Sequence, residues 1–148
     1  MTTVSEVMTR NVRSMFPSDS IVLAAQAMSE LNVGVIPVCE DGKLVGMVTD
    51  RDIVIRAVAQ GMNSVTATLA QVMSAAVQTA RADDDLEDVL NQMADRQIRR
   101  MPVVDADARL VGIVSLGDIA AKSTGEDADV GQSLGAISSP AESQPARA

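Results

Sequence analysis

The chain contains two copies of one pattern, and this internal repeat constrains its fold more than any other feature. The tripeptide Val7–Thr9 recurs 65 positions later as Val72–Ser74. After a one-residue insertion, the segment Leu44–Ile53 recurs 66 positions later as Leu110–Ile119. Two copies of a unit of roughly fifty residues predict two similar half-domains that pack with pseudo-twofold symmetry.

Composition limits what such a pair can do. The 148 residues suffice for one ordinary domain or two small ones that share a core. Apolar residues make up 47% of the chain and aromatic residues 1%, so the core must consist of Val, Ile, Leu, Met and Ala. The absence of histidine removes the commonest general base and metal ligand. No catalytic triad, phosphate-transfer loop or zinc-ligand spacing occurs, and the sequence therefore predicts a protein that is not an enzyme.

Charge and hydropathy exclude further classes of function. A net charge of -8 argues against non-specific binding of nucleic acid, which needs a broad basic surface. No apolar run approaches the roughly 20 residues of a membrane span, and no basic-then-apolar leader begins the chain. A single cysteine forms no intrachain disulfide. We therefore expect a cytoplasmic protein without nucleic-acid or membrane partners.

The local pattern predicts an α/β fold. Apolar residues at helical spacing predict helices from Ile21 to Leu31 and from Leu86 to Met93. Each helix precedes two short apolar runs separated by a turn, which is typical of a hairpin. We expect these hairpin strands at 35–39 with 44–48, and at 101–105 with 110–114. The predicted organisation is repeat 1 at 1–61, a linker at 62–68, repeat 2 at 69–122, and a disordered acidic, Ser/Pro/Ala-rich tail at 123–148.

Both copies carry the motif Gly-apolar-Val-Thr/Ser-x-x-Asp where the second strand leads into a helix. Read structurally, Thr/Ser-x-x-Asp is a capping box, and the glycine allows close packing of the strand. Read functionally, a helix N-terminus favours phosphate, a carboxylate accepts hydrogen bonds from both ribose hydroxyls, and the glycine admits a flat base. The motif alone leaves both interpretations open. Its members are Gly46, Thr49 and Asp52 in repeat 1, and Gly112, Ser115 and Asp118 in repeat 2.

The span from Val4 to about Lys122 resembles a tandem pair of CBS domains, also called a Bateman module. Three blocks carry the resemblance: Val-Met-Thr/Ser at each start, apolar-Pro-Val before each hairpin, and Leu-Val-Gly-x-Val-Thr/Ser-x-x-Asp-Ile. The segment Thr49–Arg56 is similar to that of small stand-alone bacterial CBS-pair proteins, including mycobacterial hypoxic-response members.

This resemblance implies a regulatory signal-transduction module without catalytic activity. It implies two packed α/β repeats, a homodimer, and adenosyl ligands such as AMP, ADP, ATP, NAD(H) or S-adenosylmethionine. AMP or ATP is the expected regulatory ligand, no cofactor is required, and the output goes to a separate, unidentified effector protein in a stress response. The alternative is a dimerising scaffold that binds no ligand.

Carried over residue by residue, the resemblance implies two unequal nucleotide pockets. In the first, Asp52 binds ribose beside Thr49 and Arg51, and the facing residues are Ser74, Val77, Arg99, Arg100 and Met101. In the second, Ser115 and Asp118 face Thr9, Val12, Val33, Gly34 and Val35. Guanidinium groups suit phosphate, so the first pocket is expected to be the tighter phosphate site.

Simpler interpretations of the same side chains stay open. Arg99 and Arg100 also fit a solvated pair at the entry of a strand. Arg51 also fits a surface ion pair with Asp50 or Glu40, which contributes about 0–1 kcal/mol. Cys39 is expected to be a small core residue and not a nucleophile, because no histidine is present to activate it. Methionines and acidic runs are assigned to the core and to solvated caps, so no metal site is predicted.

Overall fold

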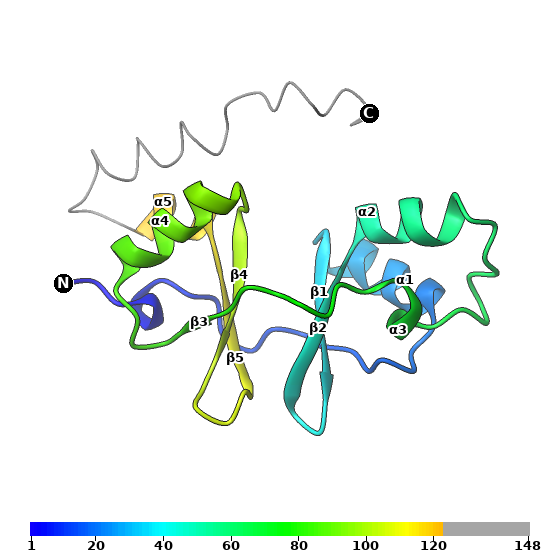
Figure 1. Cartoon of the computed structure of the whole chain (residues 1–148), viewed down its shortest axis with the longest axis horizontal. Helices are drawn as coiled ribbons and strands as arrows, with labels where there is room; N and C mark the ends of the chain where they lie inside the picture. Colours follow the sequence, from blue (N-terminus) through cyan, green and yellow to red (C-terminus); the bar gives the residue numbers. More distant parts are fainter. Residues whose placement is uncertain (123–148) are drawn as a thin grey trace. The chain divides into compact units, whose positions relative to one another are not determined.

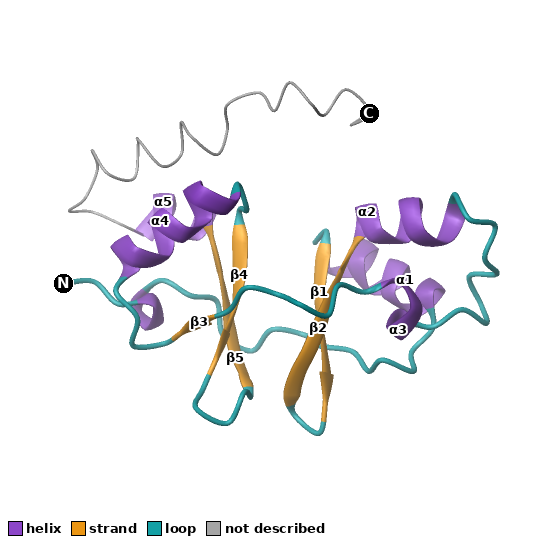
Figure 2. Cartoon of the chain, in the orientation of Figure 1, coloured by secondary structure: helices purple, strands orange, loops and turns teal. Residues whose placement is uncertain are grey.

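The computed structural model describes residues 1–122, and the predicted disordered tail at 123–148 lies outside them. Helices and strands are mixed in the order that the sequence predicts, which confirms the α/β class (Figures 1 and 2). The first repeat contains η1 (Val4–Glu6), α1 (Ile21–Leu31), β1 (Val35–Glu40), β2 (Lys43–Thr49), α2 (Asp50–Asp52) and the π-helix η2 (Ile53–Val58). The second contains α3 (Leu69–Val72), β3 (Ala80–Arg81), α4 (Leu86–Arg96), β4 (Arg100–Val104), β5 (Leu110–Ser115) and α5 (Leu116–Lys122).

The described residues divide into two compact units that do not coincide with the two repeats. The β1–β2 unit comprises Asn11–Gln78 and Val104–Leu110. The β3–β5 unit comprises Met1–Arg10, Thr79–Val103 and the described residues from Val111 on. We call the first residues of each repeat, Val4–Thr9 and Leu69–Ser74, its start segment. Each unit therefore combines the helix and most of the hairpin of one repeat with the start segment of the other. The pseudo-twofold packing of the repeats stays a prediction.

The start segments enter these units because their short helices cannot bury their own apolar residues. In the β1–β2 unit, Leu69 and Val72 of α3 are fully buried in a core with residues of α1, β1 and β2. In the β3–β5 unit, Val4 and Val7 are buried beside α4, β4 and α5 in the same way. Burying side chains of this size contributes roughly 1.5–3 kcal/mol each, which fixes both segments in place.

Hairpin strands form the sheet of the β1–β2 unit, as predicted. β1 and β2 pair antiparallel from Val35 opposite Thr49 to Glu40 opposite Lys43, with an irregularity after Val38. Met15 adds a short parallel bridge to Val38 on the other side of β1. The β3–β5 unit has the same plan, since β3 lies beside β4 and β4 beside β5.

Local capping explains where the two long helices begin and end. The Ser20 hydroxyl accepts a hydrogen bond from the Leu23 N–H at 3.3 Å, and the Asp85 carboxylate accepts one from the Glu87 N–H at 3.1 Å. Short polar side chains of this kind are the preferred N-caps of helices. At the other ends, Asn32 and Gln97 adopt the left-handed conformation with φ of 56° and 52°. Residues there turn the chain sharply towards β1 and β4.

The helix after β2 differs from the ordinary α-helix that the sequence predicts. Only Asp50–Asp52 is α-helical, and the next six residues form a π-helix. The Ala59 N–H donates to the Val54 carbonyl, five residues earlier, at 2.9 Å. Single π turns often accompany functional sites. No helix within residues 1–122 is long and apolar enough to cross a bilayer.

Cys39 is a buried core residue of β1, as predicted, with 6% of its surface exposed. Burial raises the pKa of the Cys39 thiol, and a hydrogen bond with the Ser14 side chain opposes this shift. We therefore expect Cys39 to react with a thiol reagent much more slowly in the folded protein than in denaturant. A raised folded-state pKa gives stability that is complete below the unfolded thiol's pKa of about 8.5 and is lost as pH rises above it.

Urea unfolding at neutral and alkaline pH checks the expected loss of stability with rising pH. Wild type should lose more stability towards alkaline pH than Cys39→Ala, which has no thiol to titrate. Equal pH dependence of the two proteins contradicts the assigned cause.

Candidate functional site

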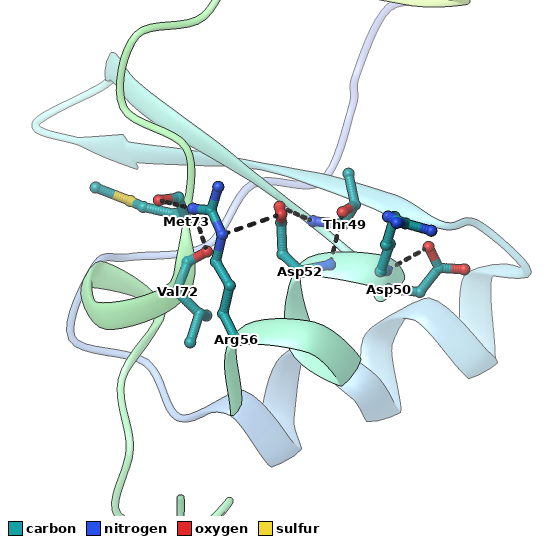
Figure 3. Close-up of polar contacts among 7 residues, drawn as sticks. Thr49, Asp50, Asp52, Arg56, Val72 and Met73 are labelled. Atoms are coloured by element: carbon teal, nitrogen blue, oxygen red, sulfur yellow. Dashed lines mark hydrogen bonds and ion pairs between the residues drawn. The ribbon is translucent and has the colours of Figure 1, made fainter. Parts of the chain in front are cut away.

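The Thr49–Asp52 segment forms a reciprocal capping box at the start of α2. The Asp52 N–H donates to Thr49 Oγ1 at 3.0 Å, and the Thr49 N–H donates to Asp52 Oδ2 at 3.0 Å (Figure 3). The structural interpretation of Thr-x-x-Asp is therefore confirmed here. A carboxylate has roughly four acceptor positions, so this single contact leaves Asp52 able to accept further donors.

The equivalent motif of the second repeat is bonded differently. The Asp118 N–H donates to Ser115 Oγ at 3.1 Å, as in a cap. The Asp118 carboxylate accepts a hydrogen bond from the Thr9 hydroxyl at 3.0 Å. Thr9 belongs to the start of the first repeat, so the contact joins the start of repeat 1 to the end of repeat 2 within the β3–β5 unit.

Both motifs lie beside a start segment that is paired to the second hairpin strand. Met47 and Ser74 exchange two backbone hydrogen bonds of 2.9 Å. Thr9 and Ile113 exchange the equivalent pair, at 2.8 and 3.0 Å. The structure therefore brings Ser74 beside the first motif and Thr9 beside the second, while their role in a nucleotide pocket stays a prediction.

The glycine of each motif is required by this pairing. A Cβ atom on Gly46 would lie 2.7 Å from the Ser74 carbonyl oxygen and 2.9 Å from Met73 Sδ. A Cβ atom on Gly112 would lie 2.7 Å from the Thr9 carbonyl oxygen and 2.9 Å from Met8 Sδ. Close packing of the strand is therefore a sufficient reason for the glycine, without any base to accommodate.

Arg56 is a site residue that the sequence analysis missed. Its Nη1 donates to the carbonyl oxygens of Val72 and Met73, at 3.3 Å each, and its Nε lies 3.8 Å from Asp52 Oδ1 (Figure 3). The equivalent residue 66 positions later is Lys122, whose Nζ donates to the Val7 carbonyl at 3.2 Å. The available signal was a basic residue four positions after the aspartate in both copies.

The remaining predicted residues divide between the two units. With Thr49 and Asp52, the β1–β2 unit holds Arg51, Ser74, Val77, Val12, Gly34 and Val35. With Ser115, Asp118 and Thr9, the β3–β5 unit holds Arg99, Arg100 and Met101. The sequence analysis expects some residues of one unit to share a pocket with the motif of the other unit, such as Arg99 with Asp52. These shared pockets stay predictions.

Burial and backbone contacts describe these residues further. Arg51, Arg99 and Arg100 are exposed. Met101 is fully buried, so its side chain packs in the core. The Arg99 carbonyl accepts from the Leu116 N–H at 2.8 Å, and the Gly34 carbonyl accepts from the Asp50 N–H at 3.0 Å. Arg99 therefore lies beside the start of α5, next to Ser115.

The two motifs offer polar groups that suit the binding of a ligand. Each motif presents a carboxylate, a hydroxyl and backbone groups at the end of a strand. Within the part of the chain that the structure describes, no three His, Cys, Asp or Glu side chains are grouped closely enough to hold a metal ion. The motifs provide hydrogen-bond acceptors and donors suited to a polar organic ligand.

Comparison with known proteins places these units in a family. The CBS domain family matches residues 4–58 and 69–125. The CBS domain-containing protein YhcV of Bacillus subtilis is 46% identical over 120 residues, covering 81% of this chain and 84% of that protein. Hypoxic response protein 1 of Mycobacterium tuberculosis is 39% identical over 121 residues, covering 81% and 84%. The chain therefore belongs to the CBS domain family, as a protein with two CBS repeats.

Solved structures of similar proteins contain several ligands. The crystal structure of Hypoxic Response Protein I, with two coordinated zinc ions, has a TM-score of 0.77 at 37% identity and covers 83% of this chain and 100% of its own. CBSX2 in complex with AMP has a TM-score of 0.73 at 31% identity, covering 82% and 95%. The CBS domain pair of MJ0100, in complex with 5-methylthioadenosine and S-adenosylmethionine, has a TM-score of 0.73 at 32% identity, covering 82% and 94%.

Proposed function

We propose that this protein is a non-enzymatic regulatory module that binds adenosyl ligands at its two Thr/Ser-x-x-Asp motifs. One observation carries the proposal: in each unit, a motif aspartate is linked to the start segment of the other repeat, Asp118 directly through the Thr9 hydroxyl and Asp52 through Arg56. The complexes of CBSX2 with AMP and of MJ0100 with methylthioadenosine and S-adenosylmethionine support adenosyl compounds as the ligand class.

The ribose is the part of the ligand that these carboxylates suit best. Two neighbouring ribose hydroxyls are donors, and an ionised carboxylate is an acceptor with two oxygens. Hydrogen bonds to a charged partner contribute about 1.5–3 kcal/mol. We assign Asp52 and Asp118 this role, with the Thr49 N–H holding the Asp52 carboxylate and the Thr9 hydroxyl holding the Asp118 carboxylate. The Asp52 side chain is 16% exposed, so it is partly accessible to a ligand.

Phosphate groups require cations, and we assign this role to exposed arginines. Arg100 begins β4 and Arg99 directly precedes it, and a planar guanidinium binds phosphate oxygens in pairs. Arg51 follows Thr49 and is the arginine of the β1–β2 unit assigned the same role. AMP or ATP is therefore the proposed ligand before less charged adenosyl compounds.

Regulation by such a ligand needs a separate output. We propose that the protein is a homodimer and that ligand binding changes its interaction with an effector protein, which requires different affinities of the ligand for two states. We also propose a role in a stress response, on the basis of the similarity to Hypoxic response protein 1.

The competing function is a ligand-free dimerising scaffold. One observation favours it: Thr49 and Asp52 form a reciprocal capping box, and Ser115 Oγ accepts from the Asp118 N–H, so both motifs have a structural role as helix caps. In that case both motifs serve only as helix caps, and the start segments serve only to pair with the second hairpin strand of the other repeat.

An ultraviolet spectrum and a calorimetric titration separate the two functions. With no Trp or Tyr, the protein absorbs little where adenine does, so bound nucleotide is visible in the gently purified protein. We expect carried-over adenine absorbance, or saturable binding of at least one of AMP, ATP, NADH and S-adenosylmethionine. A clean spectrum with flat titrations for all four compounds would favour the scaffold.

A further inference from the structure

Arg56 connects the carboxylate of the first motif to the start segment of the second repeat. Its guanidinium reaches two main-chain carbonyls, those of Val72 and Met73, and its Nε approaches Asp52 Oδ1 (Figure 3). The next residue, Ser74, is held to Met47 by two backbone hydrogen bonds. The Arg56 side chain therefore contacts both parts of the proposed ligand site in this unit, the Asp52 carboxylate and the segment before Ser74.

The second unit shows which part of this contact is general. Lys122 occupies the equivalent position and donates to the Val7 carbonyl, which matches Val72 in the repeat. A basic side chain at this position thus ties the start segment in both units. In the second unit, the Asp118 carboxylate is held instead by the Thr9 hydroxyl. Arg56 combines, in one side chain, two tasks that Lys122 and Thr9 divide.

Arg56 approaches only one of the two carboxylate oxygens of Asp52. Oδ2 accepts from the Thr49 N–H at 3.0 Å, and Oδ1 is the oxygen 3.8 Å from Arg56 Nε. The Arg56 side chain is 50% exposed, so the ion pair alone contributes little to folding. Its position is better suited to orienting the carboxylate than to stabilising the fold.

We propose that Arg56 is a positioning residue for the ligand, which holds Asp52 and the segment before Ser74 in the arrangement that binds ribose. This inference rests on the proposed function. Arg56 acts through Asp52, because its guanidinium is already engaged by the carboxylate and the two carbonyls. Removing it frees the carboxylate and loosens the start segment, so that a ligand must order both on binding.

The test is a double-mutant cycle with AMP as the probe, measured by calorimetry on the full-length chain. All variants carry Asp118→Ala, so that the titration reports the Asp52 site. Arg56→Ala should weaken AMP binding about three- to tenfold when Asp52 is present, and have little effect in an Asp52→Ala background. Arg56→Gln, which keeps a donor for the Val72 carbonyl but no charge for Asp52, should also weaken binding.

Arg13→Ala is the matched control, because it removes one exposed arginine from the same unit with the same change in net charge. It should leave AMP affinity unchanged. A merely structural role for Arg56 predicts equal losses with and without Asp52, and that result, or no loss at all, overturns the inference. Loss of AMP binding in the Asp118→Ala parent, or affinity there that is independent of Asp52, overturns the assignment of Asp52 as a ligand site and this inference with it. Wild type that binds no AMP overturns the proposed function.

Discussion

Replacing Gly46 or Gly112 with alanine is expected to destabilise the fold by about 2–3 kcal/mol, because the new methyl group has no space. At each position the added Cβ would lie 2.7 Å from a main-chain carbonyl oxygen of the paired start segment. These oxygens, on Ser74 and Thr9, also accept the backbone hydrogen bonds that hold the segments. Neither oxygen can withdraw without breaking that pairing, so we expect the loss in urea-unfolding measurements.

Gly117→Ala is the matched control, since it adds the same methyl group to the same protein. The nearest atom to a Cβ there is Ser115 Oγ at 3.9 Å, which is ordinary contact. Because Gly117 lies in α5, alanine should stabilise the helix by about 0.5–1 kcal/mol. If Gly46→Ala and Gly112→Ala are as stable as wild type, the close approach of the start segments is incorrect.

Removing either motif carboxylate should weaken ligand binding by roughly ten- to hundredfold. Asp52→Ala and Asp118→Ala each delete the acceptor of two ribose hydroxyls, which is worth about 1.5–3 kcal/mol. Calorimetric titration with AMP should show each variant losing affinity at one class of site only, since the two carboxylates belong to different units.

The asparagine variants control for the loss of a helix cap. Asp52→Asn keeps a side-chain oxygen for the Thr49 N–H, but it has no charge and only one acceptor oxygen. It should retain the stability of wild type within about 0.5 kcal/mol and still bind AMP more weakly. Equal affinity of wild type, Asp52→Asn and Asp52→Ala would leave Asp52 as a cap alone.

Local patterns predicted the elements of this fold well, because their signals lie within each element. The helical spacing from Ile21 and the alternating turns and apolar runs around β1 and β2 correspond to the observed helix and hairpin. The caps of these helices are local as well, because the short polar side chains of Ser20 and Asp85 accept backbone hydrogen bonds within three residues.

Long-range arrangement was harder to predict from the sequence. The short helix Leu69–Val72 has the same apolar pattern whichever core it enters, and only tertiary packing places it in the β1–β2 unit. The π-helix Ile53–Val58 has no distinctive spacing, because its apolar residues also fit an α-helix. Packing beyond the local sequence decides between the two.

The candidate site was predicted in part for the same reason. Thr49 and Asp52 are three residues apart, so their contact is local and visible as a motif. Arg56 acts on carbonyl oxygens of Val72 and Met73, and main-chain acceptors carry no signature in the sequence. The repeated basic residue at Arg56 and Lys122 was the only sign of it.

A crystal structure of the full-length protein with AMP tests most directly whether the two motifs bind the ligand. We predict that both ribose hydroxyls lie within hydrogen-bond distance, about 2.6–3.0 Å, of the Asp52 or Asp118 carboxylate. Ordered AMP bound away from both aspartates, with the two capping motifs unchanged, would contradict the claim that these motifs are the ligand sites.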